Sequence, residues 1–260
     1  MYINTNINYN NLINSPLEQF EVTNLLSLNA PIFGYLNITL TNLALYSILI
    51  LFLIISLHIM GNNDIKLLSS KWSILIESLF ASINSMVKEQ IGKEIYLPFI
   101  YSIFFFILIA NLTGNVPYSY TITSSAIVCM GLSITIFIGV TLLGLTKHRL
   151  HFFSYFVPSG TPLALVPLLA LIELISYLSR AGSLGIRLFA NIVAGHTLLK
   201  ILSTFLYQMF SGSIIVAILT IIPFSIFITL IGLELAVSFI QAYIFSILVC
   251  SYIKEALELH

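Results

Sequence analysis

Charged residues are scarce in this sequence, and their scarcity excludes an ordinary water-soluble protein. Only 8% of the 260 residues are Asp, Glu, Lys or Arg, whereas 58% are hydrophobic. A soluble domain carries about 25% charged residues, so this chain lacks the side chains needed to cover a surface in water. The formal net charge is zero, so nothing favours binding to nucleic acid or to an acidic substrate. The chain is therefore predicted to be a membrane protein.

Cysteine and targeting signals are also sparse. Cys129 and Cys250 both lie inside apolar runs and form no CxxC pair, so we expect small buried side chains, with no metal site and no cofactor. The first 14 residues are rich in asparagine and lack the basic and apolar segments of a secretory signal. Two interpretations of residues 1–14 stay open, a cleaved leader or a tail. Residues 15–260 are interpreted as a single integral membrane domain.

Long apolar runs predict membrane-spanning helices, because a helix needs about 20 apolar residues to cross a hydrocarbon core of about 30 Å. These runs cover residues 39–60, 95–112, 122–145, 161–208 and 212–253. Residues 72–91 differ from them, because apolar side chains recur there at helical spacing among charged ones. That pattern predicts an amphipathic helix at the membrane interface.

The last two runs are too long for simple spans. As continuous helices they would measure about 60 to 70 Å, twice the membrane thickness. Each could form a pair of spans, but turn residues are few, and Pro223 alone predicts a kink rather than a loop. We therefore expect an all-α membrane protein: one N-terminal transmembrane helix, an amphipathic interfacial helix, a transmembrane hairpin, and two long tilted antiparallel helices.

Basic residues support this arrangement and predict its orientation. With one pass per long helix, seven lysines and arginines outside the spans fall on one side of the membrane, and the other side has none. The seven are Lys66, Lys71, Lys88, Lys93, Lys147, Arg149 and Lys254. By the positive-inside rule the N-terminus lies outside and the C-terminus inside. Dividing either long apolar run into two spans would keep part of this one-sided distribution of basic residues.

Ionisable side chains inside the fourth run are candidates for function, because charges in hydrocarbon are costly. Glu173, Arg180 and Arg187 are seven residues apart, so they drift only about 20° per step and share one helix face. Asn191 lies one turn beyond Arg187 on that face. His196 lies about half a turn around the helix from Arg187, so we expect it to face a different cavity.

The last helix carries a matching stripe. Its members are Glu234, Gln241 and Glu255. In an antiparallel pair these lie toward His196, Arg187 and Glu173, respectively. The pattern predicts two acid-lined patches at opposite sides of the membrane, separated by a cation that cannot lose its proton. Such a relay conducts protons only if a carrier on another subunit moves between the patches.

A simpler alternative is that these charges form internal ion pairs between the helices. Arg180 has Glu173 two turns away, so for Arg180 both interpretations are open. Arg187 has no acidic residue one turn away. His196 and Glu234 could form a static hydrogen-bonded pair.

Several segments resemble the subunit a family of F-type ATP synthases. The two most specific are Ser183–His196, SLGIRLFANIVAGH, and Gly232–Phe245, GLELAVSFIQAYIF. Asn111–Tyr118 is similar to the mid-chain turn of that family, and Ser15–Phe20 to the mature start of fungal mitochondrial members. The resemblance covers almost the whole chain.

The resemblance implies a role for each buried polar residue. Arg187 would be the essential arginine facing a ring of c subunits, positioned by Asn191 and Gln241, with Arg180 as a supporting charge. Two half-channels would flank it. The one open to the intermembrane space would contain His196 and Glu234, and the one open to the matrix Glu173 and Glu255.

The family also implies a location and partners. The chain would lie in the mitochondrial inner membrane, with its N-terminus in the intermembrane space and its C-terminus in the matrix. Its long helices would pack against the c-ring, and its other partners would be the peripheral stalk subunit b, other small membrane subunits, lipid and protons. It would bind no nucleotide and catalyse nothing by itself.

Other classes of membrane protein remain as alternatives. A haem-bearing redox subunit needs paired histidines, and only His58 and His196 fall in the predicted spans. A secondary transporter needs broken helices, for which Pro223 and the Gly182/Gly185 pair are weak signals. A purely structural subunit fits poorly with so many buried charges.

Overall fold

The protein is helical throughout most of the chain that the computed structural model describes. The described residues are 17–29, 37–62, 70–116, 119–149, 152, 165–211 and 219–258. Their main helices are α1 (Asn42–Gly61), α2 (Lys71–Gln90), α3 (Leu97–Gly114), α4 (Ala126–His148), α5 (Val166–Phe210) and α7 (Ile221–Leu257). Three short 3-10 helices are η1 (Glu18–Phe20), η2 (Glu94–Tyr96) and η3 (Ile122–Ser124). Residues 1–14, which were interpreted as either a cleaved leader or a tail, lie outside the described residues.

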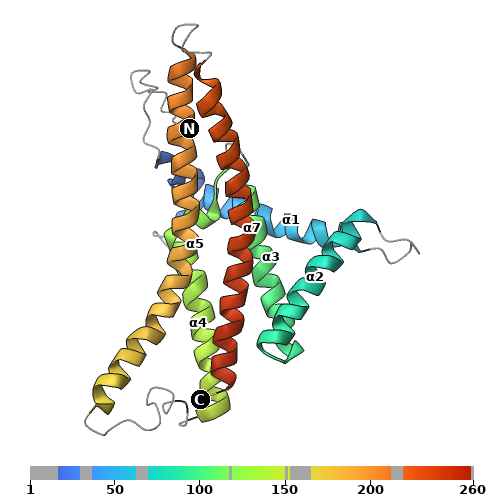
Figure 1. Ribbon diagram of the computed structural model, residues 1–260, viewed down its shortest axis with the longest axis vertical. Helices are drawn as coiled ribbons and strands as arrows, with labels where there is room; N and C mark the ends of the chain where they lie inside the picture. The colour runs from blue at the N-terminus through green and yellow to red at the C-terminus, as the bar shows by residue number, and fades with distance from the viewer. Residues whose placement is uncertain are drawn as a thin grey trace.

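Five of the described helices are long and apolar enough to cross a membrane, which confirms the predicted membrane fold. The two long runs form α5, with 45 residues, and α7, with 37. At 1.5 Å per residue α5 is about 68 Å long. Because α5 is unbroken through Gly182 and Gly185, its run does not divide into two spans. The end of α5 lies beside the start of α7 at the top of Figure 1, so the pair is antiparallel as predicted.

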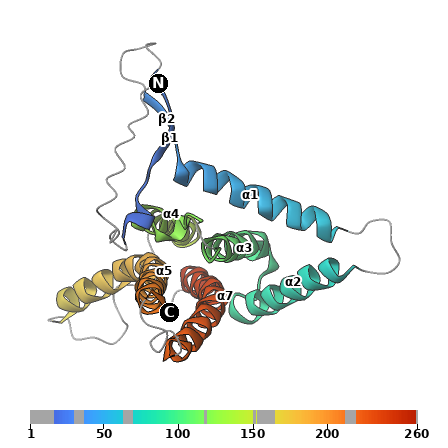
Figure 2. The ribbon, with the colours of Figure 1, turned by 90° about the horizontal axis from the view of Figure 1, so that it is seen from above.

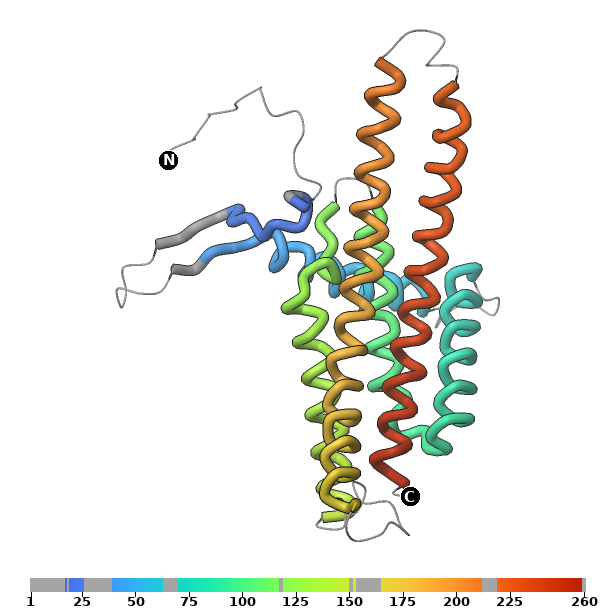
Figure 3. Tube along the Cα trace, turned by 60° about the vertical axis from the view of Figure 1, so that its left-hand side comes forward, coloured from blue at the N-terminus to red at the C-terminus, as the bar shows by residue number. Residues whose placement is uncertain are grey.

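Four helices run alongside one another, and one crosses them. Figures 1 and 3 show α3 and α4 next to the lower halves of α5 and α7. Seen from above, α1 runs across the direction of these four helices (Figure 2). The shared core contains side chains from all four of them, such as Phe105, Ile136, Leu188 and Phe245. The long pair is therefore supported along one side by the shorter hairpin.

The amphipathic helix α2 packs its apolar face on this core. Ile83, Met86 and Val87 are buried against it, while Lys88 and Glu89 are exposed. The predicted helix at residues 72–91 is confirmed within one residue at each end. Part of the apolar face of α2 is therefore buried against the protein itself.

A short hairpin precedes α1, and the sequence analysis predicted no strands. β1 (Asn24–Asn29) pairs antiparallel with β2 (Asn37–Thr41). The first transmembrane helix therefore begins at Asn42 rather than at residue 39. The Thr41 hydroxyl accepts a hydrogen bond from the Ala44 amide at 3.3 Å, which satisfies a free N–H of the first turn. This N-cap explains where the strand ends and the helix begins.

Glycine at position 185 allows α4 and α5 to approach closely. A Cβ atom there would lie 2.7 Å from the Ser133 Oγ and 2.9 Å from the backbone oxygen of Cys129. Any larger residue would push α5 away from α4. The contact leaves the opposite face of α5, which carries Arg187, directed away from the bundle.

The C-terminal end of α7 is held by α4. Lys147 Nζ donates a hydrogen bond to the Leu257 carbonyl at 2.6 Å, and His148 Nε2 lies 3.1 Å from the same oxygen. The last carbonyls of a helix have no partner within the helix and carry partial negative charge, so a cation there is stabilising. The two residues together form a cap supplied by a neighbouring helix.

We expect Lys147→Met to loosen the last turn of α7. The variant keeps the length of the side chain and removes the cation, which is worth about 0.3–1 kcal/mol at a helix end. Hydrogen exchange of the last α7 amides should become faster, while exchange in the middle of α7 should not change. Lys147→Arg should restore the slow exchange, and equal exchange in all three proteins would contradict the cap.

Candidate functional site

Arg187 lies on the exposed face of α5. Within the described part of the chain, its side chain makes no hydrogen bond or ion pair. The internal ion pair considered for Arg187 is therefore absent among these residues. A permanently charged guanidinium presented outward can interact with a group on another subunit.

One turn beyond Arg187, a hydrogen bond joins the two long helices. Asn191 Nδ2 donates to Gln241 Oε1 at 2.8 Å. Gln241 is only 4% exposed, whereas Asn191 is exposed. The bond fixes α5 and α7 relative to each other near the level of Arg187. The seven-residue spacing on the two helices predicted Asn191 and Gln241 at this level.

His196 and Glu234 face each other farther along the pair. His196 Nε2 and Glu234 Oε1 are 3.7 Å apart, and their side chains are 15% and 11% exposed. Neither atom has a hydrogen-bond partner among the described residues. The separation is too long for a direct hydrogen bond, so a static hydrogen-bonded pair is not present. The pair is nevertheless within ion-pair distance when the imidazole is protonated.

Gly195 makes room for the glutamate. A Cβ atom at position 195 would lie 2.8 Å from Glu234 Oε1. The carboxylate therefore occupies the space that a side chain would fill at this helix crossing. A larger residue at position 195 would require the end of the Glu234 side chain to shift.

Polar residues from α3 and the segment after it extend this site. Asn115 Nδ2 donates to Ser238 Oγ at 2.9 Å, and Ser238 Oγ donates to the Glu234 carbonyl at 2.9 Å. A Cβ atom at Gly114 would lie 2.4 Å from Thr121 Cγ2 and 3.8 Å from His196 Nε2. These contacts place the end of α3 against both His196 and Glu234.

The same region contains buried polar atoms that lack protein partners. They belong to Asn111, Asn115, Tyr120, Thr121 and Thr123. Burial raises the pKa of the Tyr120 hydroxyl, so it remains a protonated donor. Unpaired buried polar atoms are expensive unless water satisfies them. We did not select any of these as site residues from the sequence, although the family-like segment Asn111–Tyr118 contains two of them.

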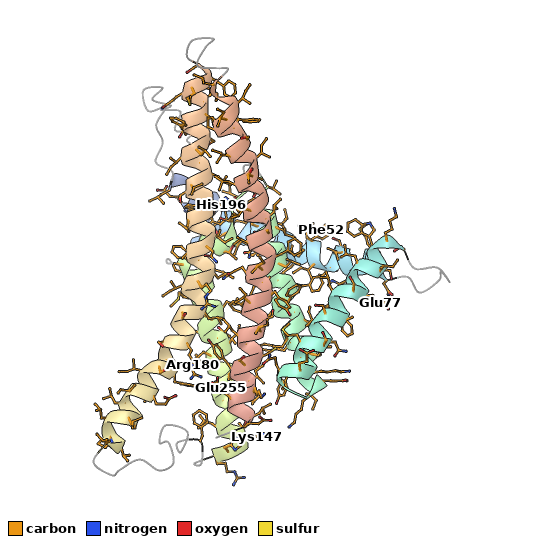
Figure 4. All side chains as sticks on the ribbon, in the orientation of Figure 1. Phe52, Glu77, Lys147, Arg180, His196 and Glu255 are labelled. Carbon is orange, nitrogen blue, oxygen red and sulfur yellow. The ribbon has the colours of Figure 1, made fainter. Side chains whose placement is uncertain are left out.

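At the opposite end of the pair, Arg180 contacts both acidic residues. It forms an ion pair with Glu255 of α7, and its Nη2 lies 3.9 Å from Glu173 Oε1. The first part of α5 diverges from α7 here, and Figure 4 shows Arg180 and Glu255 at that point, well below His196. Of the two interpretations of Arg180, the internal ion pair is therefore present.

A small cavity adjoins this ion pair. It encloses about 20 Å³ and is lined by aromatic residues together with Arg180 and Glu255. One water molecule needs roughly 10–15 Å³ of such space, so a single water fits. Among the described residues, no group of three His, Cys, Asp or Glu side chains is placed to hold a metal ion.

Comparison with known proteins identifies the family. Residues 43–254 match the family model described as ATP synthase A chain. The chain belongs to this family. It is 64% identical over 251 residues to ATP synthase subunit a of Mycosarcoma maydis, covering 96% of this chain and 99% of that protein. It is also 49% identical over 253 residues to ATP synthase subunit a of Emericella nidulans, covering 96% and 98%.

Membership settles the general role of the chain. It is a multi-pass membrane protein and a non-catalytic proton-channel subunit of the ATP synthase membrane sector. It works there together with other subunits of the complex. The haem-bearing, secondary-transporter and purely structural alternatives are therefore excluded.

Proposed function

We propose that this ATP synthase A chain member is the proton-conducting stator subunit that provides two offset half-channels, and that Arg187 couples proton movement to rotation of a c-ring. The observation that carries this proposal is the position of Arg187. It is exposed and unpaired within the described residues, and two acid-containing sites flank it along the α5–α7 pair. A proton cannot pass an arginine directly, because a guanidinium stays protonated.

One half-channel contains His196 and Glu234 and opens to the intermembrane space. Either side chain can take up and release a proton, and the facing nitrogen and oxygen atoms lie only 3.7 Å apart. The buried polar atoms of Asn111, Asn115 and Thr121 support a hydrated approach to this pair from the α3 side.

The other half-channel contains Glu173 and Glu255 and opens to the matrix. Both carboxylates contact Arg180, so one cation is shared between two acids. A carboxylate in this arrangement can receive a proton that leaves the ring. The water-sized cavity beside Arg180 and Glu255 supports proton transfer at this point.

Small residues lie along the proposed ring face of α5 on both sides of Arg187. Ser183, Ala190 and Ala194 are exposed there, one to two turns from Arg187. Small side chains let membrane helices approach closely. A carboxylate on a ring helix could therefore come within reach of the guanidinium, and the Asn191–Gln241 bond keeps the two ring-facing helices in register.

The proposed location is the mitochondrial inner membrane, with the N-terminus in the intermembrane space and the C-terminus in the matrix. The fungal relatives and the one-sided distribution of basic residues support this. Helix α1, with 20 residues, has the length of a simple span and runs across the long pair. The long pair is thus strongly tilted. Subunit b of the peripheral stalk and other small membrane subunits are further proposed partners.

A map of the intact complex would test the proposal. We expect a ring of helices opposite Arg187, with a ring carboxylate level with the guanidinium. Each 100 mV across the membrane supplies about 2.3 kcal/mol per proton, and most of this energy would act over the gap around Arg187. A map in which Arg187 turns into its own subunit and binds its own carboxylates would contradict the proposal.

A further inference from the structure

An aromatic residue from the N-terminal segment contacts the histidine of the outer site. The rings of Phe20 and His196 have centroids 6.3 Å apart and an interplanar angle of 70°, an edge-to-face contact. The two residues are far apart in the sequence, and the N-terminal segment reaches the long helices beside α4 and α5 (Figure 2). Edge-to-face packing is a favourable geometry for aromatic rings, so the contact restrains the imidazole.

The segment that carries Phe20 is anchored to the first transmembrane helix. The Asn42 side chain accepts a hydrogen bond from the Thr23 amide at 3.3 Å and donates one to the Glu21 carbonyl at 3.1 Å. The Asn42 backbone amide donates to the Thr23 carbonyl at 3.1 Å. Three bonds from one residue fix the chain immediately after Phe20. The segment is therefore a defined part of the fold.

Two other elements border the His196 imidazole. Glu234 of α7 faces Nε2 at 3.7 Å, and Gly114 at the end of α3 leaves space beside the same nitrogen. Glu234 is the titratable group that faces the imidazole among the contacts of the described residues. Phe20 supplies the apolar wall of this site.

We propose that Phe20 is a positioning residue for proton uptake: its ring holds the His196 imidazole toward Glu234 and shields it from the outer solution. This inference rests on the proposed function of His196 and Glu234. Asn42 contributes indirectly, because it holds the backbone that carries the phenyl ring. The N-terminal segment would then shape the entry side of the outer half-channel.

The test uses the complete ATP synthase reconstituted in vesicles, with three variants of this chain. Phe20→Ala removes the ring, Phe20→Tyr retains an aromatic edge, and Asn42→Ala removes two of the three bonds that hold the segment without changing either ring. The Thr41 cap of α1 remains in all three variants. Two measurements are made on each: proton-driven ATP synthesis as a function of pH on the outer side, and modification of His196 by diethyl pyrocarbonate, followed by mass spectrometry.

For Phe20→Ala we expect a several-fold faster modification of His196 and a displaced outer-side pH profile, with an unchanged profile on the opposite side. Asn42→Ala should behave similarly but less strongly, and Phe20→Tyr should resemble the parent. The inference is overturned if Phe20→Ala matches the parent in both measurements, or if both sides shift equally. His196→Ala separates the two proposals. An unchanged outer-side profile in that variant rejects the proposed function, whereas the modification rate still reports on the Phe20 contact in the other variants.

Discussion

Replacing Arg187 by alanine is expected to abolish proton-driven ATP synthesis while the chain still folds and assembles. The side chain is exposed and makes no hydrogen bond or ion pair within the described residues, so its loss removes only a longer-range electrostatic effect such as the one that it exerts on Tyr252. Surface substitutions of this kind usually change the free energy of unfolding by less than about 0.5 kcal/mol. Without the cation, the ring should either stall, because its carboxylate is no longer released, or let protons leak between the half-channels.

Synthesis and passive proton flux would both be measured in vesicles with an imposed potential. Ser183→Ala is a matched control, because it lies one turn away on the same exposed face. Arg187→Lys tests whether charge alone is sufficient, and we expect it to restore little, because lysine can lose its proton and lacks the planar guanidinium. Coupled synthesis in the alanine variant would remove Arg187 from the mechanism.

Glu234→Gln should slow proton entry from the outer side by about 10²-fold, the lower end of what a positioned proton-transfer group contributes. Glutamine has nearly the same size, so packing against Gly195 and His196 is retained. An amide neither accepts nor releases a proton near neutral pH, so the proton path is interrupted at position 234. The measurement is the rate of synthesis at several outer pH values, together with the amount of assembled complex.

The control for this substitution is Glu94→Gln. Glu94 pairs with Lys88 at 2.8 Å on an exposed surface, with side chains 68% and 52% accessible. The substitution therefore removes a carboxylate far from the proposed proton path. Normal flux with lost assembly in Glu234→Gln would mean that the His196–Glu234 pair mainly holds the two helices together. Loss of proton flux with normal assembly would assign the His196–Glu234 pair to proton transfer.

Periodicity was sufficient to predict the arrangement of the long pair. Residues seven apart share a helix face, and an antiparallel partner places a second stripe opposite them. Contacts between Asn191 and Gln241, and between His196 and Glu234, lie at the predicted levels. These follow from helix geometry, which depends only on local sequence.

Contacts between distant segments could not be predicted in this way. The antiparallel stripes placed Glu255 toward the Glu173 end of the pair, but they did not predict that Arg180 pairs with Glu255 there. The Asn115–Ser238 bond and the Phe20–His196 contact join elements that no periodicity relates. Their formation depends on how α3 and the N-terminal segment pack against the long helices.

The close contact at Gly185 has a mechanical consequence. A part that stays still beside a turning rotor must resist a sideways force, and on the proposed function this force falls on α5. At Gly185 no side chain separates α5 from the Cys129 backbone and the Ser133 hydroxyl. Because packed protein interiors are barely compressible, the load passes almost directly into α4. On the proposed function, the absence of a side chain at Gly185 thus lets the shorter hairpin support α5 rigidly, and we expect the gap between Arg187 and the rotor to change little under torque.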